Sequence, residues 1–127
     1  MNILHYLLEK YPNKRWDWGE LSRNPNVTMD IIEEYPDKYW NWGSYGISDN
    51  PNITMEMIEK YPNKPWDWCG ISMNPNITIE FIEKYINKIN FQELSINTFT
   101  YENKHLKKKE SYWLLEKMRA FNKTENL

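Results

Sequence analysis

The chain has 127 residues, of which 40% are hydrophobic, 27% charged and 16% aromatic, and its formal net charge is -2 at pH 7. That length is enough for one globular domain with a single core. The mean hydropathy of -0.86 and the lack of a long apolar run exclude a transmembrane helix, so we expect no membrane partner. A single cysteine, Cys69, excludes an internal disulfide, and only two histidines accompany it, so we expect no metal site and no cofactor.

A tandem repeat organises the sequence. Its period is marked by Tyr11, Tyr35, Tyr61 and Tyr85, which are 24, 26 and 24 residues apart. Each unit joins an Asn-Pro-Asn triplet, followed by Val or Ile and then Thr, to a later pair of tryptophans separated by one residue. The two extra residues of the middle unit fall in Gly-Ser-Tyr-Gly at 43–46, which indicates a turn on one face of a stack.

The chain begins in the middle of a repeat unit, because residues 2–11 match residues 26–35. No small-residue cleavage site follows the charged and apolar residues of this segment, so we expect an intracellular, non-secreted protein. The outward face of this first unit lacks a cap, and an exposed apolar patch there favours a homo-oligomer. The apolar residues of that face are Ile3, Leu4, Leu7 and Leu8.

Each following unit contains one amphipathic helix. In residues 53–62, Thr54 is a good N-cap, Glu56 suits the positive end of the helix dipole, and Pro62 ends the helix. The unit before it repeats this pattern, and the unit after it repeats all of it except the proline. The predicted apolar stripe of the helix consists of Ile53, Met57, Ile58 and Tyr61.

The second half of each unit is shorter and begins with two tryptophans. Gly and Ser within residues 66–74 argue against a long α-helix, and Pro75 disfavours the helical conformation of Asn74. We therefore expect one helical turn or a short 3₁₀ helix. No segment alternates with period two, so we expect almost no strand. The side chains available to cap the short helix are Asp17, Asn41 and Asp67.

The paired tryptophans allow two interpretations. In the structural one, at least one indole of each pair points inward and lies over the equivalent residue of the next unit. In the functional one, the outer indole of each pair lines a ligand-binding surface. We favour the structural interpretation, because Ile89 and Phe91 replace the pair in the last unit and keep only its hydrophobicity. The six tryptophans of this candidate surface are Trp16, Trp18, Trp40, Trp42, Trp66 and Trp68.

After Tyr101 the repeat stops and a basic tail follows. Residues 1–103 carry 9 basic and 15 acidic side chains, whereas residues 104–127 carry 7 and 3. The spacing of apolar residues in 104–121 predicts a final helix, whose apolar stripe would cover the open face of the last unit. The same helix could dock an anionic partner such as RNA through three consecutive lysines. These are Lys107, Lys108 and Lys109.

The unit xISxNPNITxExIEKYPxKPWDW resembles tandem repeats in proteins of giant DNA viruses that infect amoebae, the mimivirus group. The resemblance covers residues 1–101, and LSINTFTYENK is similar to the closing phrase of such arrays. The Asn-Pro-Asn-x-Thr helix entry is also similar to that of leucine-rich repeat variant proteins. That second resemblance implies an α-helix and a 3₁₀ helix alternating in a right-handed superhelix. Neither resemblance implies an active site, and the iron–sulfur module of the second family would need more than one cysteine.

These features predict an all-α protein: a small helical-repeat solenoid of about four units in residues 1–101, with a C-terminal capping helix and tail in residues 102–127. Without a nucleophile–base pair or a Gly-rich phosphate loop, we expect no enzymatic activity. The predicted function is a non-enzymatic interaction or scaffold protein of viral origin, which binds a protein partner in the host cytoplasm or the virion. The alternative is a single-stranded nucleic-acid binder that uses the basic C-terminal helix and the outer tryptophans.

Overall fold

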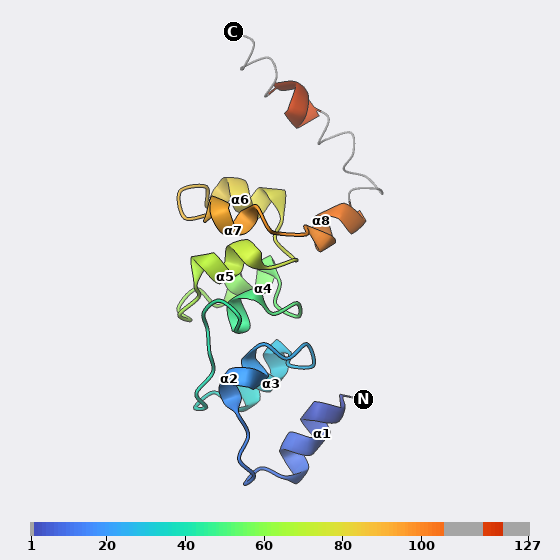
Figure 1. Ribbon diagram of the computed structural model, residues 1–127, viewed down its shortest axis with the longest axis vertical. Coiled ribbons are helices and arrows are strands. Elements are labelled where there is room, and N and C mark those ends of the chain that lie inside the picture. The colour runs from blue at the N-terminus through green and yellow to red at the C-terminus, as the bar shows by residue number, and fades with distance from the viewer. Residues whose placement is uncertain (1, 106–115, 121–127) are drawn as a thin grey trace.

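The computed structural model describes residues 2–105 and 116–120 of the chain. Within these residues all regular structure is helical and no strand is present, which confirms the all-α expectation for this part of the protein. Figure 1 shows the helices following one another along the long axis, from α1 at one end to α6, α7 and α8 toward the other. None of the described helices is both long enough and apolar enough to span a membrane.

The first kind of helix follows the Asn-Pro-Asn-x-Thr sequence. The hydroxyl of Thr54 accepts a hydrogen bond from the backbone N–H of Met57 at 3.3 Å. Thr78 accepts the same bond from Phe81 at 3.1 Å, whereas Thr28 occupies the N-cap position without a side-chain bond. The helices of this kind are α3 (Met29–Glu34), α4 (Met55–Lys60) and α6 (Ile79–Lys84). The helix α1 (Ile3–Lys10) has no such sequence before it and is capped by Asn2, whose side chain accepts a hydrogen bond from His5 N.

The second kind of helix begins at or after the second tryptophan position, and all of them except α5 are shorter than the first kind. Asp17 and Asp67 cap two of these helices by accepting bonds from Glu20 N and Cys69 N at 3.0 and 3.2 Å. In the middle unit the helix is 3₁₀ and starts late, because Tyr45 takes a left-handed conformation (φ 57°) within the two-residue insertion. The helices are α2 (Trp18–Ser22), η1 (Ile47–Asp49), α5 (Trp68–Met73) and α7 (Phe91–Leu94).

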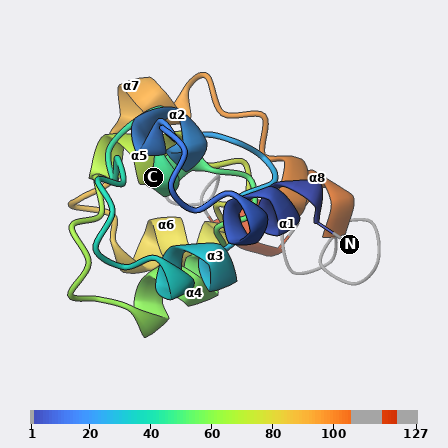
Figure 2. The same ribbon diagram turned by 90° about the horizontal axis from the view of Figure 1, so that it is seen from below.

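The two kinds of helix lie on opposite sides of the long axis. Seen along that axis in Figure 2, α3, α4 and α6 gather on one side and α2, α5 and α7 on the other. In Figure 1, α2 and α3 share one level, α4 and α5 the next, and α6 and α7 the one after. The helix α5 packs against η1 before it and α7 after it.

The core runs between these two rows of helices. The apolar residue after each Asn-Pro-Asn is fully buried. The isoleucines that precede Ser48 and Ser72 are fully buried as well. The buried stripe of α4 differs from the expected one, because Met55 and Ile58 face the core while Met57 is only half-buried. Ile53 and Tyr61 lie outside the six residues of α4. The four-residue spacing that links them to Met57 therefore does not define one face of this helix. The buried residues in these positions are Val27, Ile47, Ile53, Ile71 and Ile77.

The C-terminal part is described only in pieces. The last helix of the main segment, α8 (Thr100–His105), begins before the predicted start at residue 104, and Tyr101 N donates to Pro75 O at 3.1 Å. Residues 116–120 are helical and exposed, with Met118 53% exposed. Lys117 Nζ lies 2.7 Å from a carboxylate oxygen of Glu83 in α6. Most of the predicted capping helix, including Lys107, Lys108 and Lys109, lies outside the described residues.

Candidate binding groove

The first tryptophan of each pair is held by a hydrogen bond within its own unit. The indole N–H of Trp40 donates to the carbonyl oxygen of Tyr35 at 2.9 Å. Trp16 and Trp66 make the same bond to Tyr11 and Tyr61, at 2.9 and 2.7 Å. A partner for the indole N–H is what a partly buried tryptophan requires. The tyrosines that mark the repeat period therefore use their carbonyl groups to orient the next indole.

The second tryptophan of each pair contacts the following unit. Trp18 meets Trp40 with ring centroids 5.0 Å apart, and Trp42 meets Trp66 at 5.1 Å, both edge to face. We expected at least one indole of each pair to lie over the equivalent residue of the next unit, but the second indole instead contacts the first indole of that unit. Edge-to-face packing places the positive edge of one ring against the negative face of another, which a sandwich of equivalent rings cannot do.

A lysine of the following unit covers the second tryptophan as well. Lys38 Nζ lies 5.3 Å from the ring centroid of Trp18, and Lys64 Nζ lies 5.7 Å from that of Trp42. In the last pair, Lys88 Nζ lies 5.4 Å from the ring of Trp68. These distances are within the range of cation–π attraction. The repeat thus places one ammonium group at each second indole.

Each of the six tryptophans of the candidate surface packs against the core. Trp40 is 7% exposed, and the other five are half-buried. Both members of each pair therefore contribute to packing, while part of most rings stays accessible. The structural interpretation accounts for the positions of all six, and the accessible parts of Trp66 and Trp68 line a groove.

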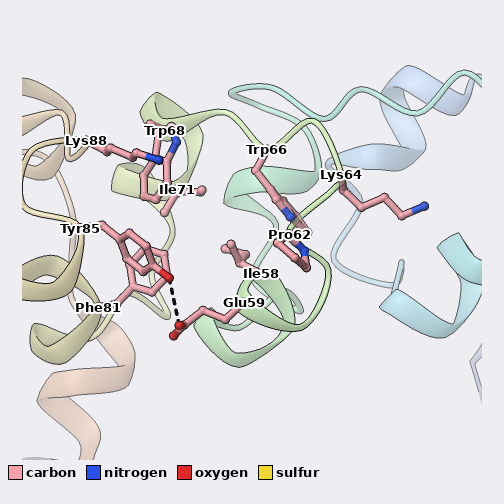
Figure 3. A pocket seen from close by; sticks show the side chains of 10 residues that line it. All are labelled: Ile58, Glu59, Pro62, Lys64, Trp66, Trp68, Ile71, Phe81, Tyr85 and Lys88. Atoms are coloured by element: carbon pink, nitrogen blue, oxygen red, sulfur yellow. Dashed lines mark hydrogen bonds between the residues drawn. The ribbon is translucent and has the colours of Figure 1, made fainter.

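The groove lies between the third and fourth units and has a volume of 330 Å³. Figure 3 shows Trp68, Phe81 and Tyr85 on one side of it, Trp66 on the other, and Ile58 and Ile71 between them. Trp68 lies 5.3 Å from Tyr85 and 5.9 Å from Phe81 between ring centroids. In the fourth unit, Ile89 stands where Trp40 and Trp66 stand in the earlier ones, so no indole edge covers Trp68. The residues that line the groove are Ile58, Glu59, Pro62, Lys64, Trp66, Trp68, Ile71, Phe81, Tyr85 and Lys88.

Charged groups surround this aromatic surface. Glu59 accepts hydrogen bonds from Lys84 Nζ at 2.5 Å and from the Tyr85 hydroxyl at 3.1 Å. The hydrogen bond from Lys84 holds the pKa of the Glu59 carboxyl below its usual value, with Tyr85 adding to the effect against the opposing influence of burial. The same hydrogen bond raises the pKa of Lys84. Lys64 and Lys88 line the groove without a carboxylate ion pair among the described residues.

A row of asparagines in one phase of the repeat, of which Asn50 and Asn74 are buried, connects successive units through side-chain amides. The side-chain amide of Asn74 donates to the carbonyl oxygens of Ser48 at 2.9 Å and Ile53 at 3.0 Å, both in the preceding unit. Asn50 and Asn97 reach back to their preceding units in the same way. The recurrence of asparagine in one phase of the repeat is the signal that could have revealed this role.

Comparison of this chain with protein-family models, with curated proteins and with solved structures finds no match. The site must therefore be interpreted from its own geometry. Among the described residues, that geometry brings aromatic faces and the ammonium group of Lys88 together at the groove, while the side chain of Lys64 extends away from Trp66 (Figure 3). The lysine run after residue 105 lies outside the described residues.

Proposed function

We propose that residues 1–101 form a short helical-repeat solenoid, in which each unit is stabilised mainly by its neighbours. Support comes from contacts that recur at the repeat period. Asn50, Asn74 and Asn97 donate to the preceding unit, and the buried hydroxyls of Ser22 and Ser72 accept from the following one, at Asn41 N (2.8 Å) and Asn90 N (2.9 Å). The described C-terminal residues serve in this proposal as part of an end cap.

The proposed function of this array is non-enzymatic binding of another protein. The observation that carries it is the groove of 330 Å³ in which Trp66, Trp68 and Tyr85 lie beside the ammonium group of Lys88. Accessible aromatic surface next to uncompensated positive charge suits a peptide segment that carries an apolar side chain beside an acidic one. By resemblance to the giant-virus repeats, we propose that the interaction occurs in the cytoplasm of an infected cell or in the virion.

Selection of peptides from a displayed random library against the full chain tests this function. We expect enriched sequences to combine Asp or Glu with an aromatic or aliphatic residue. Lys88→Ala should weaken their binding by about tenfold, the effect of losing a charge pair of roughly 1.4 kcal/mol. Lys38→Ala is the matched control, because Lys38 covers Trp18 as Lys88 covers Trp68 but lies outside the groove. No enrichment, or equal loss in both variants, would contradict the proposal.

Binding of single-stranded nucleic acid is the second candidate. The observation that favours it is the recurrence of a lysine beside a partly accessible indole in three successive units, at Trp18, Trp42 and Trp68. Bases stack on aromatic rings while lysines follow the phosphates, and such binding weakens steeply with salt. Titration with a single-stranded oligonucleotide at low and moderate salt should then quench tryptophan fluorescence in a salt-dependent way. Absence of quenching at low salt removes this candidate.

A further inference from the structure

Three side chains with metal-binding atoms converge at the first unit, far from the groove in sequence. His5 Nε2 lies 2.6 Å from a carboxylate oxygen of Glu34 and 3.2 Å from one of Glu9. Their potential ligand atoms all lie within 4.8 Å of one another. His5 is half-buried and the two glutamates are exposed, so the cluster is open to water on one side.

Two helices from successive units build this cluster. His5 and Glu9 are four residues apart in α1, which places them one above the other on the same face. Burial of Leu8 in the core fixes the rotation of α1 about its axis, and Asn2 Nδ2 donates to Asn26 O at 2.6 Å, which ties the start of α1 to the next unit. Glu34 is the last residue of α3, on that next unit. The arrangement is therefore held by packing outside the three side chains themselves.

Two carboxylate oxygens lie close to the same imidazole nitrogen in this cluster. One imidazole nitrogen can donate a single proton, yet two carboxylates face Nε2 of His5. Within residues 2–105 and 116–120, no lysine or arginine forms an ion pair with Glu9 or Glu34.

We propose that His5, Glu9 and Glu34 bind one divalent zinc ion that links α1 to α3. One imidazole nitrogen and two carboxylate oxygens are a donor set that zinc accepts, and the open side leaves room for water to complete a tetrahedral shell. Such an ion neutralises both carboxylates at once and adds a bond between the first unit and the second. The inference is independent of the groove and of its proposed partner.

Titration of the full, tag-free, metal-depleted chain with zinc chloride tests the proposal. Calorimetry should give one ion per chain. His5→Gln and Glu34→Gln should each weaken binding by more than about tenfold, since even loss of a group that only orients a ligand has an effect of that size. His105→Gln and Glu56→Gln are the matched controls, because they make the same chemical changes at exposed positions outside the cluster and should bind as the wild type does.

Hydrogen–deuterium exchange separates a bridging ion from one held by α1 alone. Zinc should slow amide exchange in residues 3–10 of the wild type, because the ion ties this helix to α3, and should not do so in Glu34→Gln. Far-UV circular dichroism confirms that each variant is folded. Absence of zinc binding by the wild type, equal binding by His5→Gln, or loss of binding only in His105→Gln would each overturn the assignment.

Discussion

Trp18 and Trp40 meet edge to face, with ring centroids 5.0 Å apart and an interplanar angle of 79°. The two rings belong to different repeat units, and the same relationship recurs between Trp42 and Trp66. The second indole of one unit therefore packs against the first indole of the next. This offset pairing makes each tryptophan pair a connector between units. Single substitutions in the pairs should therefore lower the stability of the contact between neighbouring units.

Replacement of Trp40 tests that connection. Trp40 is 7% exposed and its N–H donates to Tyr35 O. Trp40→Ala should lower the free energy of unfolding by about 3–5 kcal/mol, because it leaves a cavity and removes the ring contact. Trp40→Phe should cost less, since it keeps an aromatic ring but loses the hydrogen bond. Urea unfolding measures both, with Tyr39→Ala as control because Tyr39 is 92% exposed; equal stability of all three variants would refute the connector role.

Asn74→Ala tests the row of asparagines. The substitution removes the side-chain partner of the Ser48 carbonyl group and of the Asn76 N–H. The Ile53 carbonyl group loses one of its two side-chain donors and keeps the one from Asn76. Each buried polar group that loses its partner costs about 1–3 kcal/mol, so we expect a loss of at least about 2 kcal/mol in chemical denaturation. Asn63→Ala, at an exposed turn position, should change stability by less than about 0.5 kcal/mol. Similar midpoints for the two variants would show that the row carries no stability.

Gly70→Ala tests the close approach of two short helices. A Cβ atom at Gly70 would lie 2.6 Å from the Cβ of Ser48, so α5 or η1 would have to move. We expect a loss of about 1–3 kcal/mol, the usual cost of overpacking. Gly19→Ala is the control, because its added Cβ meets only Asp17 Oδ1 at 3.3 Å. Thermal melting curves of both variants decide the matter, and a wild-type melting temperature for Gly70→Ala would mean that the helices can separate freely.

The ion pair between Glu59 and Lys84 predicts a pH dependence. The folded pKa of Glu59 is lowered from 4.5, so its carboxylate stabilises the folded chain above that pH, and the stabilisation is lost as pH falls through the lower folded pKa. Glu59→Gln should therefore reduce stability slightly at pH 7, and the difference from wild type should vanish at the acidic end of the range. The effect stays small because the pair is exposed. A difference that persists unchanged below the folded pKa would contradict this assignment.

The local elements followed from short-range rules. Thr54 and Thr78 begin helices and cap them through their hydroxyl groups, as their place after Asn-Pro-Asn predicted. Asp17 and Asp67 cap the short helices, which was also predictable from their position before the second tryptophan. The buried face of α4 was predicted less well, because a helix of six residues is too short for its period to define the face without knowledge of the neighbouring unit.

The two candidate sites depend on contacts between residues that are far apart in the sequence, which no local sequence pattern predicts. Spacing alone places His5 beside Glu9, but only the packing of α1 on α3 brings Glu34 to them. The groove likewise forms where Phe81 and Tyr85 of one helix face Trp66 and Trp68 of the preceding unit.

The amino-acid sequence by itself determined the helices, their caps and the period at which aromatic residues recur, because these depend on backbone hydrogen bonds and side chains within a few residues of each other. Only the tertiary structure decided that second indoles pair with first indoles, that asparagine amides bind carbonyl groups of the preceding unit, and which aromatic faces remain accessible. Those outcomes arise from the rotation and offset between neighbouring units, which are set by the joint packing of residues about 24 positions apart.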